Sequence, residues 1–256
     1  MKDLFSVEGK TVVVTGGSRG IGLMIARGFV EGGALVYISS RKQDVCDKVA
    51  SELSKTGTCI SVPADLSTEE GVKQLAHQIC EREDSIDVLV NNAGANWGAP
   101  LAEYPDAAWD KILALNVKAI FFLTRELLAP LEKAASPDAP ARVINIGSVD
   151  GLHVPPLETY AYSTSKAAVH HLTRTLARQF AGRHVTVNAI APGPFESRMM
   201  KETLDNFRDA IVSAVPLARI GTPEDMAGVA IYLASRAGAY VTGAVIPVDG
   251  GMATCL

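Results

Sequence analysis

Apolar residues along this chain fall into short runs that alternate with longer stretches of mixed apolar and polar positions. The short runs are rich in β-branched residues, as expected for strands buried on both faces of a parallel sheet. These predicted strands are residues 11–15, 34–40, 58–64, 87–90, 142–148, 185–191 and 245–251. The stretches between them predict helices at residues 21–31, 42–55, 68–82, 106–134 and 163–180, and Thr222-Pro223 predicts the start of another. This alternation predicts an α/β fold with a parallel sheet.

Length and composition favour a single domain. The chain has 256 residues, of which 48% are apolar, with 22 Gly and 13 Pro. This length is at the upper end of what one hydrophobic core supports, and large α/β domains commonly reach it. We therefore expect one domain that spans residues 1–256.

Charge and cysteine usage narrow the range of partners. The net charge is −4 and the basic residues are scattered, so the sequence predicts neither a nucleic-acid surface nor a basic membrane anchor. The four cysteines and five histidines lack the spacing of a metal site or a disulfide framework. The first residues lack the apolar core of a signal peptide, and no apolar run is long enough to cross a membrane. These features predict a cytoplasmic protein without a metal.

Glycines follow the first predicted strand directly. Gly16, Gly20 and Gly22 are spaced as GxxxGxG at the turn into the first predicted helix. Glycines at such a turn let the backbone approach a pyrophosphate, whose charge the helix N-terminal amides can hold. The alternative for a glycine turn of this kind is a tight turn without a ligand.

The end of the second predicted strand lacks the acidic residue that would bind a ribose hydroxyl. Arg41 follows that strand instead, and Arg19 lies in the glycine turn. Two guanidinium groups at this place can fork onto a 2′-phosphate, which predicts NADP(H) rather than NAD(H). The alternative is that both are ordinary surface arginines.

Two further strand ends carry polar residues. Asp65 and Leu66 end the third predicted strand, where Asp65 could accept a hydrogen bond from an adenine amino group; the alternative is a helix cap by Asp65 or Ser67. Asn91 and Asn92 end the fourth, and we interpret both as bracing the sheet through backbone hydrogen bonds.

A phenol and an ammonium group are expected one helical turn apart. Tyr162 and Lys166 share a helix face if residues 163–180 are helical, and the lysine charge would then lower the pKa of the phenol towards neutrality. Ser148, at the end of the fifth predicted strand, could donate to a carbonyl oxygen. Asn116 falls within a long predicted helix, where it is expected to bend the helix or orient a water. Taken singly, the Tyr and Lys could be surface residues and the Ser a turn residue.

In this order, these motifs resemble those of the short-chain dehydrogenases/reductases. The resemblance covers essentially the whole chain and is carried by Thr15-Gly16-(x)3-Gly20-Ile21-Gly22, Asn91-Asn92-Ala93-Gly94, Asn116, Ser148, Tyr162-(x)3-Lys166 and Pro192-Gly193. Within that family the chain is most similar to the 3-oxoacyl-thioester reductases. The resemblance implies a Rossmann-type, doubly wound sheet of about seven parallel strands with helices on both faces, and a homotetramer.

The resemblance also implies roles for individual residues. Tyr162 would be the general acid, Lys166 would lower its pKa and hold the nicotinamide ribose, Ser148 would orient the substrate oxygen, and Asn116 would carry a relay water. The residues implied to bind NADP(H) are Gly16, Ser18, Arg19, Gly20, Ile21, Gly22, Arg41, Asp65, Leu66, Asn92, Ala93, Gly94, Tyr162, Lys166, Pro192 and Gly193. The chain departs from many fatty-acid-synthesis members at Pro155, Pro156 and Tyr160, which bears on the carrier of the substrate and not on the chemistry.

The expected substrate is a small acyl compound, free or carrier-bound. Residues 194–215 are expected to form amphipathic helices that act as a substrate lid, with core packing as the alternative. Apolar candidates for the walls of the site are Trp97, Val154, Leu157, Phe195, Met199, Met200 and Phe207. They favour NADPH-dependent reduction of a 3-oxoacyl thioester or ester. The alternatives are a sugar or polyol dehydrogenase of the same family and a dinucleotide-binding protein without turnover.

Overall fold

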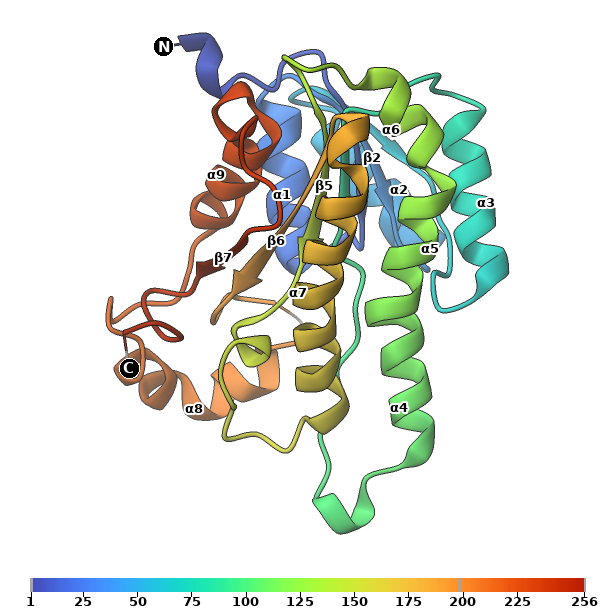
Figure 1. Cartoon of the computed structure of the whole chain (residues 1–256). Coiled ribbons are helices and arrows are strands. Elements are labelled where there is room, and N and C mark those ends of the chain that lie inside the picture. Colours follow the sequence, from blue (N-terminus) through green and yellow to red (C-terminus); the bar gives the residue numbers. More distant parts are fainter. Residues whose placement is uncertain (1, 198, 256) are drawn as a thin grey trace.

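Seven parallel strands form one sheet at the centre of the protein (Figure 1). The computed structural model describes residues 2–197 and 199–255. The strand order is β3-β2-β1-β4-β5-β6-β7. The strands are β1 (Thr11–Thr15), β2 (Leu35–Ser39), β3 (Thr58–Ser61), β4 (Val88–Asn91), β5 (Ala141–Ile146), β6 (Val185–Pro192) and β7 (Val245–Val248). The order reverses between β1 and β4, and ligands of such sheets bind at the carboxyl ends of the strands beside this switch point.

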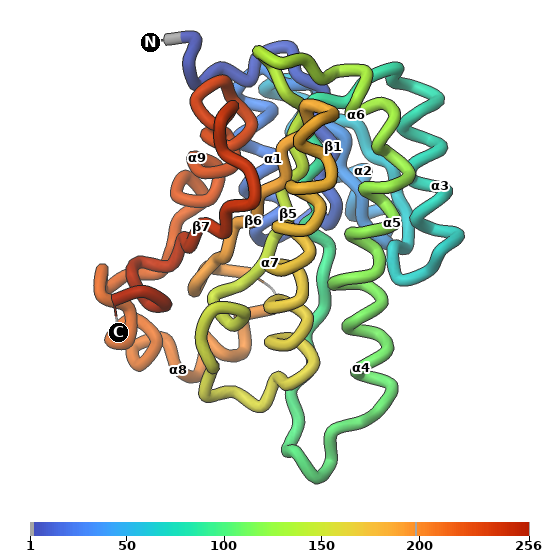
Figure 2. Tube along the Cα trace, viewed as in Figure 1, coloured from blue at the N-terminus to red at the C-terminus, as the bar shows by residue number. Residues whose placement is uncertain are grey.

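Helices cover both faces of the sheet (Figures 1 and 2). They are α1 (Gly20–Glu31), α2 (Gln43–Leu53), α3 (Glu69–Cys80), α4 (Asp106–Leu113), α5 (Ala119–Glu126), α6 (Leu128–Ala134), α7 (Tyr160–Phe180), α8 (Lys201–Ser213) and α9 (Pro223–Ala234). The single-domain, doubly wound α/β architecture expected from the sequence is confirmed, and the strand and helix ends differ from the expected ones by a few residues.

Each face of the sheet has its own hydrophobic core. Val12 and Val14 of β1 pack with α1, α2 and α9, whereas Val13 packs on the opposite side with α3, α5 and α7. Successive side chains of a strand point to opposite faces, so a run of valines supplies both cores. Each fully buried side chain of this size contributes about 1.5 to 3 kcal/mol to folding. The continuous apolar runs in the sequence reflect this two-sided burial.

Helix starts follow local capping chemistry. Thr222 and Asp225 form a capping box at the start of α9, with Pro223 in the first turn, as the sequence predicts. Thr68 caps α3 by accepting a hydrogen bond from the Gly71 amide at 3.0 Å. The alternative that Asp65 or Ser67 caps this helix is therefore wrong, because the cap is Thr68, three residues after Asp65 and one after Ser67.

Two predicted helical stretches differ from the structure. Residues 106–134 are not one regular helix: a π-helical turn at Ala114–Lys118 separates α4 from α5, and Leu127 separates α5 from α6. Asn116 lies in the π turn, which agrees with the expected bend. Of residues 195–197 and 199–215, those outside α8 are not helical, and within α8 the backbone departs from helical geometry at Phe207. Phe195 instead makes a parallel bridge to Gly221.

Candidate functional site

The glycine turn and the end of β4 are tied together at the switch point of the sheet. Asn92 Nδ2 donates to the carbonyls of Thr15 at 2.9 Å and Gly16 at 3.2 Å. The Thr15 hydroxyl accepts from the amides of Asn92 at 2.9 Å and Ala93 at 3.0 Å. A side chain on Gly16 would place its Cβ 2.6 Å from Asn92 Nδ2, so the close approach requires glycine. The bracing role inferred for Asn92 is confirmed.

The start of α1 has the features of a phosphate site. Gly16 and Gly20 have positive φ values of 66° and 52°, which bend the chain tightly into the helix. Arg19 occupies the N-cap position without a side-chain cap, and the first turn of α1 contains no acidic residue. The first amides of a helix carry partial positive charge and suit an anion. This cradle fits the pyrophosphate of a dinucleotide.

Arg19, Arg41 and Asp65 surround the next part of the candidate site. Arg19 and Arg41 are exposed, and the guanidinium group of neither makes a hydrogen bond or ion pair within residues 2–197 and 199–255. Burial by itself would raise the pKa of Asp65, but hydrogen bonds from Ser67 and the charge of Arg41 hold that pKa below its ordinary value. Ser67 donates to Asp65 through its amide at 3.0 Å and its hydroxyl at 2.7 Å. Arg41 and Asp65 therefore interact electrostatically at the carboxyl ends of β2 and β3, the places where the sequence predicted them.

Lys166 and Tyr162 lie together on the first turns of α7. Lys166 Nζ lies 5.5 Å from the centroid of the Tyr162 ring and donates to the carbonyl of Ile146 at 2.7 Å. The Lys166 side chain is buried, which lowers its pKa to about 8, while the Asp150 carboxylate acts in the opposite direction. The spacing expected from the sequence brings these two groups together at the end of β5.

The pKa of Tyr162 shifts in the direction opposite to the expected one. Burial raises the pKa of its phenol to about 12; the Ser148 hydroxyl lowers it through a hydrogen bond, and the charge of Asp150 raises it further. The expectation that Lys166 brings this pKa towards neutrality is therefore wrong, because removal of the phenol from water opposes phenolate formation. Tyr162 is held as a protonated phenol at neutral pH.

Ser148 and Asn116 complete the cluster. The Ser148 hydroxyl accepts from the Asp150 amide at 3.1 Å, so its proton points elsewhere. Asn116 is fully buried: its oxygen accepts from the Ala95 amide at 2.9 Å, and its nitrogen donates to the Ala95 carbonyl and the Ser165 hydroxyl at 3.0 Å. Asn116 therefore fixes the chain that leaves β4, through contacts with the protein itself.

Sequence reasoning missed three residues near this cluster. Asp150 influences the pKa of both Tyr162 and Lys166, and an acid two positions after Ser148 was a signal for it. His170 is buried, its pKa is lowered by burial to about 4, and it packs against Gly147. Glu158, just before α7, accepts hydrogen bonds from the Ala99 and Leu101 amides of the loop after β4, and no sequence pattern indicated this contact.

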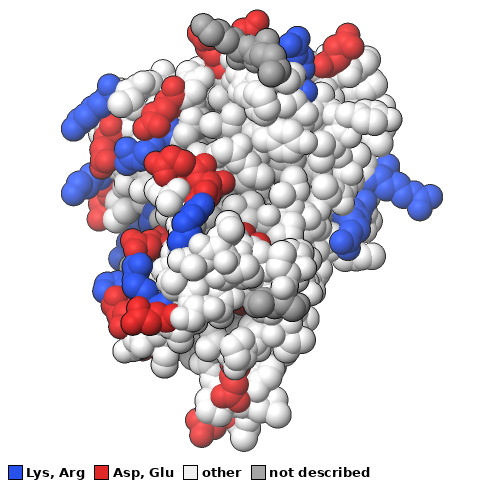
Figure 3. Space-filling view, turned by 90° about the vertical axis from the view of Figure 1, so that its left-hand side faces the viewer, with Lys and Arg blue, Asp and Glu red and all other residues white. Residues whose placement is uncertain are grey.

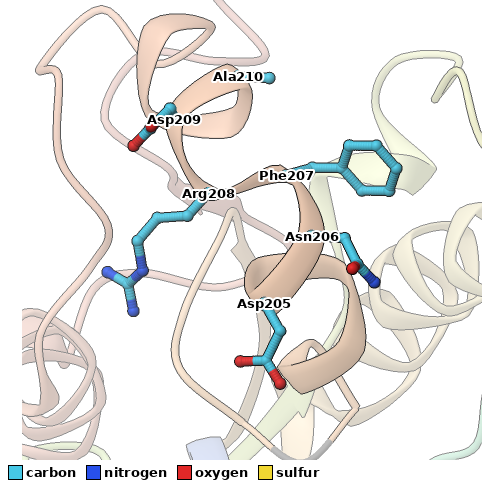
Figure 4. A pocket seen from close by; sticks show the side chains of 6 residues that line it. All are labelled: Asp205, Asn206, Phe207, Arg208, Asp209 and Ala210. Carbon is cyan, nitrogen blue, oxygen red and sulfur yellow. The ribbon is translucent and has the colours of Figure 1, made fainter.

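Of the seven predicted wall residues, five are exposed, Met200 is half-buried and Phe195 is buried. Trp97, Val154, Leu157, Met199 and Phe207 are all exposed apolar side chains. Phe195 is 2% exposed and belongs to the core beneath Gly221, so its prediction as a wall residue is wrong. On α8, Phe207 extends to the side of the helix opposite Arg208 and Asp209 (Figure 4). The hollow drawn there is lined by residues 205–210 of α8 alone, so it is distinct from the Tyr162 cluster.

Two other features bear on partners. The described residues contain no cluster of three or more His, Cys, Asp or Glu side chains placed to hold a metal ion. Within the same ranges, no helix combines the length and the apolar character needed to cross a membrane. The location in the cell stays a prediction.

Comparisons with known proteins match this geometry over almost the whole chain. A family model described as enoyl-(acyl carrier protein) reductase matches residues 16–253. The chain is 48% identical over 253 residues to the rhamnolipids biosynthesis 3-oxoacyl-[acyl-carrier-protein] reductase of Pseudomonas aeruginosa, covering 98% of this chain and 99% of that protein. The resemblance inferred from the motifs is confirmed.

Solved structures give the same result. The Pseudomonas aeruginosa RhlG/NADP active-site complex superimposes with a TM-score of 0.96 at 48% identity, covering 99% of this chain and 100% of that one. A putative NAD(P)-dependent gluconate 5-dehydrogenase from Beutenbergia cavernae, with NADP bound at low occupancy, has a TM-score of 0.90 at 38% identity and covers 97% and 98% of the two chains. The fold is therefore shared with two proteins whose solved structures contain NADP and whose names differ in substrate.

Proposed function

Because this chain belongs to the short-chain dehydrogenase/reductase family, we propose that it catalyses the NADPH-dependent reduction of a 3-oxoacyl thioester or ester to the 3-hydroxyacyl product. The observation that carries this proposal is the cluster of Ser148, Tyr162 and Lys166 at the end of β5. It combines a hydrogen-bond donor, a protonated phenol and a buried cation beside the dinucleotide cradle. Ketone reduction requires these groups at one place.

The residues present fit NADPH. The glycine turn and the α1 amides would hold the pyrophosphate, with Ser18, Ile21, Asn92, Ala93, Gly94, Pro192 and Gly193 around the rest of the dinucleotide. Arg19 and Arg41 would hold the 2′-phosphate, and Asp65 with Leu66 would face the adenine. When bound, the nicotinamide supplies the hydride.

The side chains of the cluster would divide the remaining chemistry. Ser148 already accepts from the Asp150 amide, so its hydroxyl proton can be donated to the substrate carbonyl. Tyr162 is kept protonated by its raised pKa and can deliver a proton to the same oxygen. The resulting phenolate would lie beside the Lys166 ammonium, which stabilises it. Asn116 holds the loop after β4 in place, and we propose that a relay water also depends on it.

An acyl chain suits the exposed rim better than a polyol does. Val154, Leu157 and Met199 are apolar, and each methylene buried against such a surface contributes about 0.8 kcal/mol. Polyol hydroxyls would lose water partners there without replacement. The similarity to a gluconate dehydrogenase keeps a sugar substrate as the second candidate. We further propose that α8 acts as the lid of the site.

We also propose a homotetramer. β7 is the edge strand, and all four of its residues are half-buried. On the face that carries α9 and β7, charged side chains gather mainly along the left edge, with smaller groups at the top, the right edge and the bottom, around a broad uncharged area (Figure 3). Leu113 and Phe121 are exposed on the α4–α5 side. Exposed edges and apolar faces of this kind are usually covered by other subunits. A monomer by light scattering at working concentration would contradict this proposal.

The experiment that tests the function is NADPH consumption across a panel of 3-oxoacyl thioesters of increasing chain length and a set of polyols with NADP. We expect kcat/KM to rise over the first several carbons of the acyl chain. Faster turnover of a polyol than of any thioester would replace the acyl substrate by the second candidate. Binding of NADPH without turnover of any compound would leave a dinucleotide-binding protein.

A further inference from the structure

A loop between β4 and α4 is fixed at three points beside the candidate active site. Asn116 holds Ala95, near the start of the loop, through two hydrogen bonds. Glu158 holds its middle: the Glu158 carbonyl accepts from the Ala99 amide at 3.2 Å, and Glu158 Oε1 accepts from the Leu101 amide at 3.3 Å. At its end, the Tyr104 hydroxyl donates to the Trp97 carbonyl at 3.2 Å.

Tyr160 joins this loop to the helix that carries Tyr162. Its hydroxyl donates to Glu158 Oε1 at 3.0 Å, so one carboxylate oxygen receives both Tyr160 and Leu101. The Tyr160 ring also meets the Tyr104 ring edge-on, with centroids 5.4 Å apart. We name Glu158, Tyr160 and Tyr104 the loop clasp. Because Tyr160 begins α7, the clasp sets the loop relative to Tyr162, two residues further on.

Trp97 lies between the anchors of this loop. Ala95 is bonded to Asn116 of the candidate site, and Gly98 approaches Thr159, which immediately precedes α7. These contacts fix the main chain around Trp97, whose indole is 44% exposed although Trp is one of the largest apolar side chains. A half-exposed indole on an anchored loop next to the start of α7 offers an apolar contact surface.

We infer that Trp97 is a specificity-determining residue that packs against the acyl chain of the substrate, and that Glu158 and Tyr160 are positioning residues that hold it there. This inference rests on the proposed function, because it assigns one wall of the same site. The clasp touches neither the phenol of Tyr162 nor the Ser148 hydroxyl in any hydrogen bond within the described part of the chain. It should therefore govern selectivity between substrates and leave the chemical step intact.

The first test compares a short-chain and a long-chain 3-oxoacyl thioester with Trp97→Ala. We expect kcat/KM for the long chain to fall roughly 10- to 100-fold, mainly through KM, and kcat/KM for the short chain to change little. Phe5→Ala, which removes an exposed aromatic ring from the N-terminal segment, is the matched control and should change neither value. An equal loss on both substrates, or no loss on either, would overturn the role of Trp97.

The second test separates positioning from bulk structure. Glu158→Ala removes the acceptor of Tyr160 and Leu101 and should reproduce part of the long-chain defect, roughly 5- to 10-fold. Glu158→Gln keeps an acceptor oxygen and should restore most of the activity, and Tyr160→Phe, which loses one donor, should fall between the two. The result that would overturn the positioning role is an equal defect in the Ala and Gln variants, or a defect that is the same for both chain lengths.

The third test observes Trp97 directly. The chain has two tryptophans, so Trp109→Phe leaves Trp97 as the only source of indole fluorescence. With NADP bound, titration of a long-chain 3-hydroxyacyl thioester should shift the emission of Trp97, and a short-chain one should not. If wild-type protein turned over long-chain thioesters preferentially while this emission stayed constant, the inference would fail and the proposed function would stand. If no thioester were turned over, both would fail.

Discussion

A buried cation lies at each end of β5, and the two cations differ in how many protein carbonyls accept hydrogen bonds from them. Arg142, near the start of the strand, is 3% exposed; its Nε donates to the Leu233 carbonyl at 2.9 Å and its Nη2 to the Ser235 carbonyl at 3.1 Å. Its third nitrogen group donates to Pro140. Lys166, at the other end, is 5% exposed and has one protein acceptor, Ile146.

The difference separates a structural cation from a chemical one. Leu233 and Ser235 lie at the C-terminus of α9, where carbonyl groups lack helical partners and carry partial negative charge, so Arg142 satisfies them and is itself satisfied. An ammonium group has three N–H donors, and one donor of Lys166 is bonded to the Ile146 carbonyl. Burial lowers the pKa of both groups, of Lys166 to about 8 and of Arg142 to about 10, so the two cations differ in their hydrogen bonds and not in the direction of the pKa shift.

The largest effect should come from the phenol beside Lys166. Tyr162→Phe removes the proton donor and keeps the ring, so turnover should fall by about 100-fold or more while NADPH binding remains. NADPH affinity by fluorescence titration and single-turnover rates would measure both quantities. Tyr160→Phe should leave the chemical rate nearly unchanged; the reverse ranking would show that the wrong tyrosine has been chosen.

The next effect is on stability, at the other end of the strand. Arg142→Met keeps much of the apolar volume but removes the guanidinium donors of three carbonyls, of which those of Leu233 and Ser235 are buried, so the free energy of unfolding should fall by about 2 to 3 kcal/mol. Denaturant unfolding measures this change. The kcat of the folded fraction should stay close to that of the wild type, and a selective loss of kcat without loss of stability would contradict the structural role.

The sequence predicted the scaffold better than it predicted the electrostatics. Runs such as residues 11–15 and 185–191 showed the strands because burial on both faces favours apolar and β-branched residues at successive positions. The prediction that residues 195–197 and 199–200 are helical was wrong, because their apolar and polar pattern does not show that Phe195 is fixed by a tertiary contact with Gly221. The predicted direction of the Tyr162 pKa shift was wrong because residue spacing shows which charge lies near the phenol but not how far burial removes the phenol from water.

A smaller effect should appear in the pH dependence of stability. Burial lowers the pKa of Lys166 from 10.5 to about 8, so between these values the unfolded chain holds more protons than the folded one, and stability should rise with pH. For one titrating group, the free energy of unfolding cannot change by more than about 1.4 kcal/mol per pH unit. We expect a gain of about 1 to 2 kcal/mol between pH 8 and 10 for cofactor-free wild type relative to Lys166→Met. Parallel curves for the two proteins would show that Lys166 is well solvated.

The smallest expected effect concerns a cation whose side chain makes no hydrogen bond or ion pair within the described residues. Arg142 donates to three carbonyls and Lys166 to one, whereas Arg41 makes no hydrogen bond or ion pair within the described residues and is exposed beside Asp65. An unpaired guanidinium at the end of β2 is available to the 2′-phosphate of NADPH. A charged hydrogen bond contributes about 1.5 to 3 kcal/mol, and exposure to water places Arg41 at the lower end of that range. Arg41→Ala should therefore reduce the ratio of kcat/KM for NADPH to that for NADH about tenfold and leave the NADH value nearly unchanged. Lys42→Ala, which removes a neighbouring exposed charge, is the control for long-range electrostatics. An unchanged ratio in the Arg41 variant would place the phosphate elsewhere, with Arg19 as the next residue to substitute.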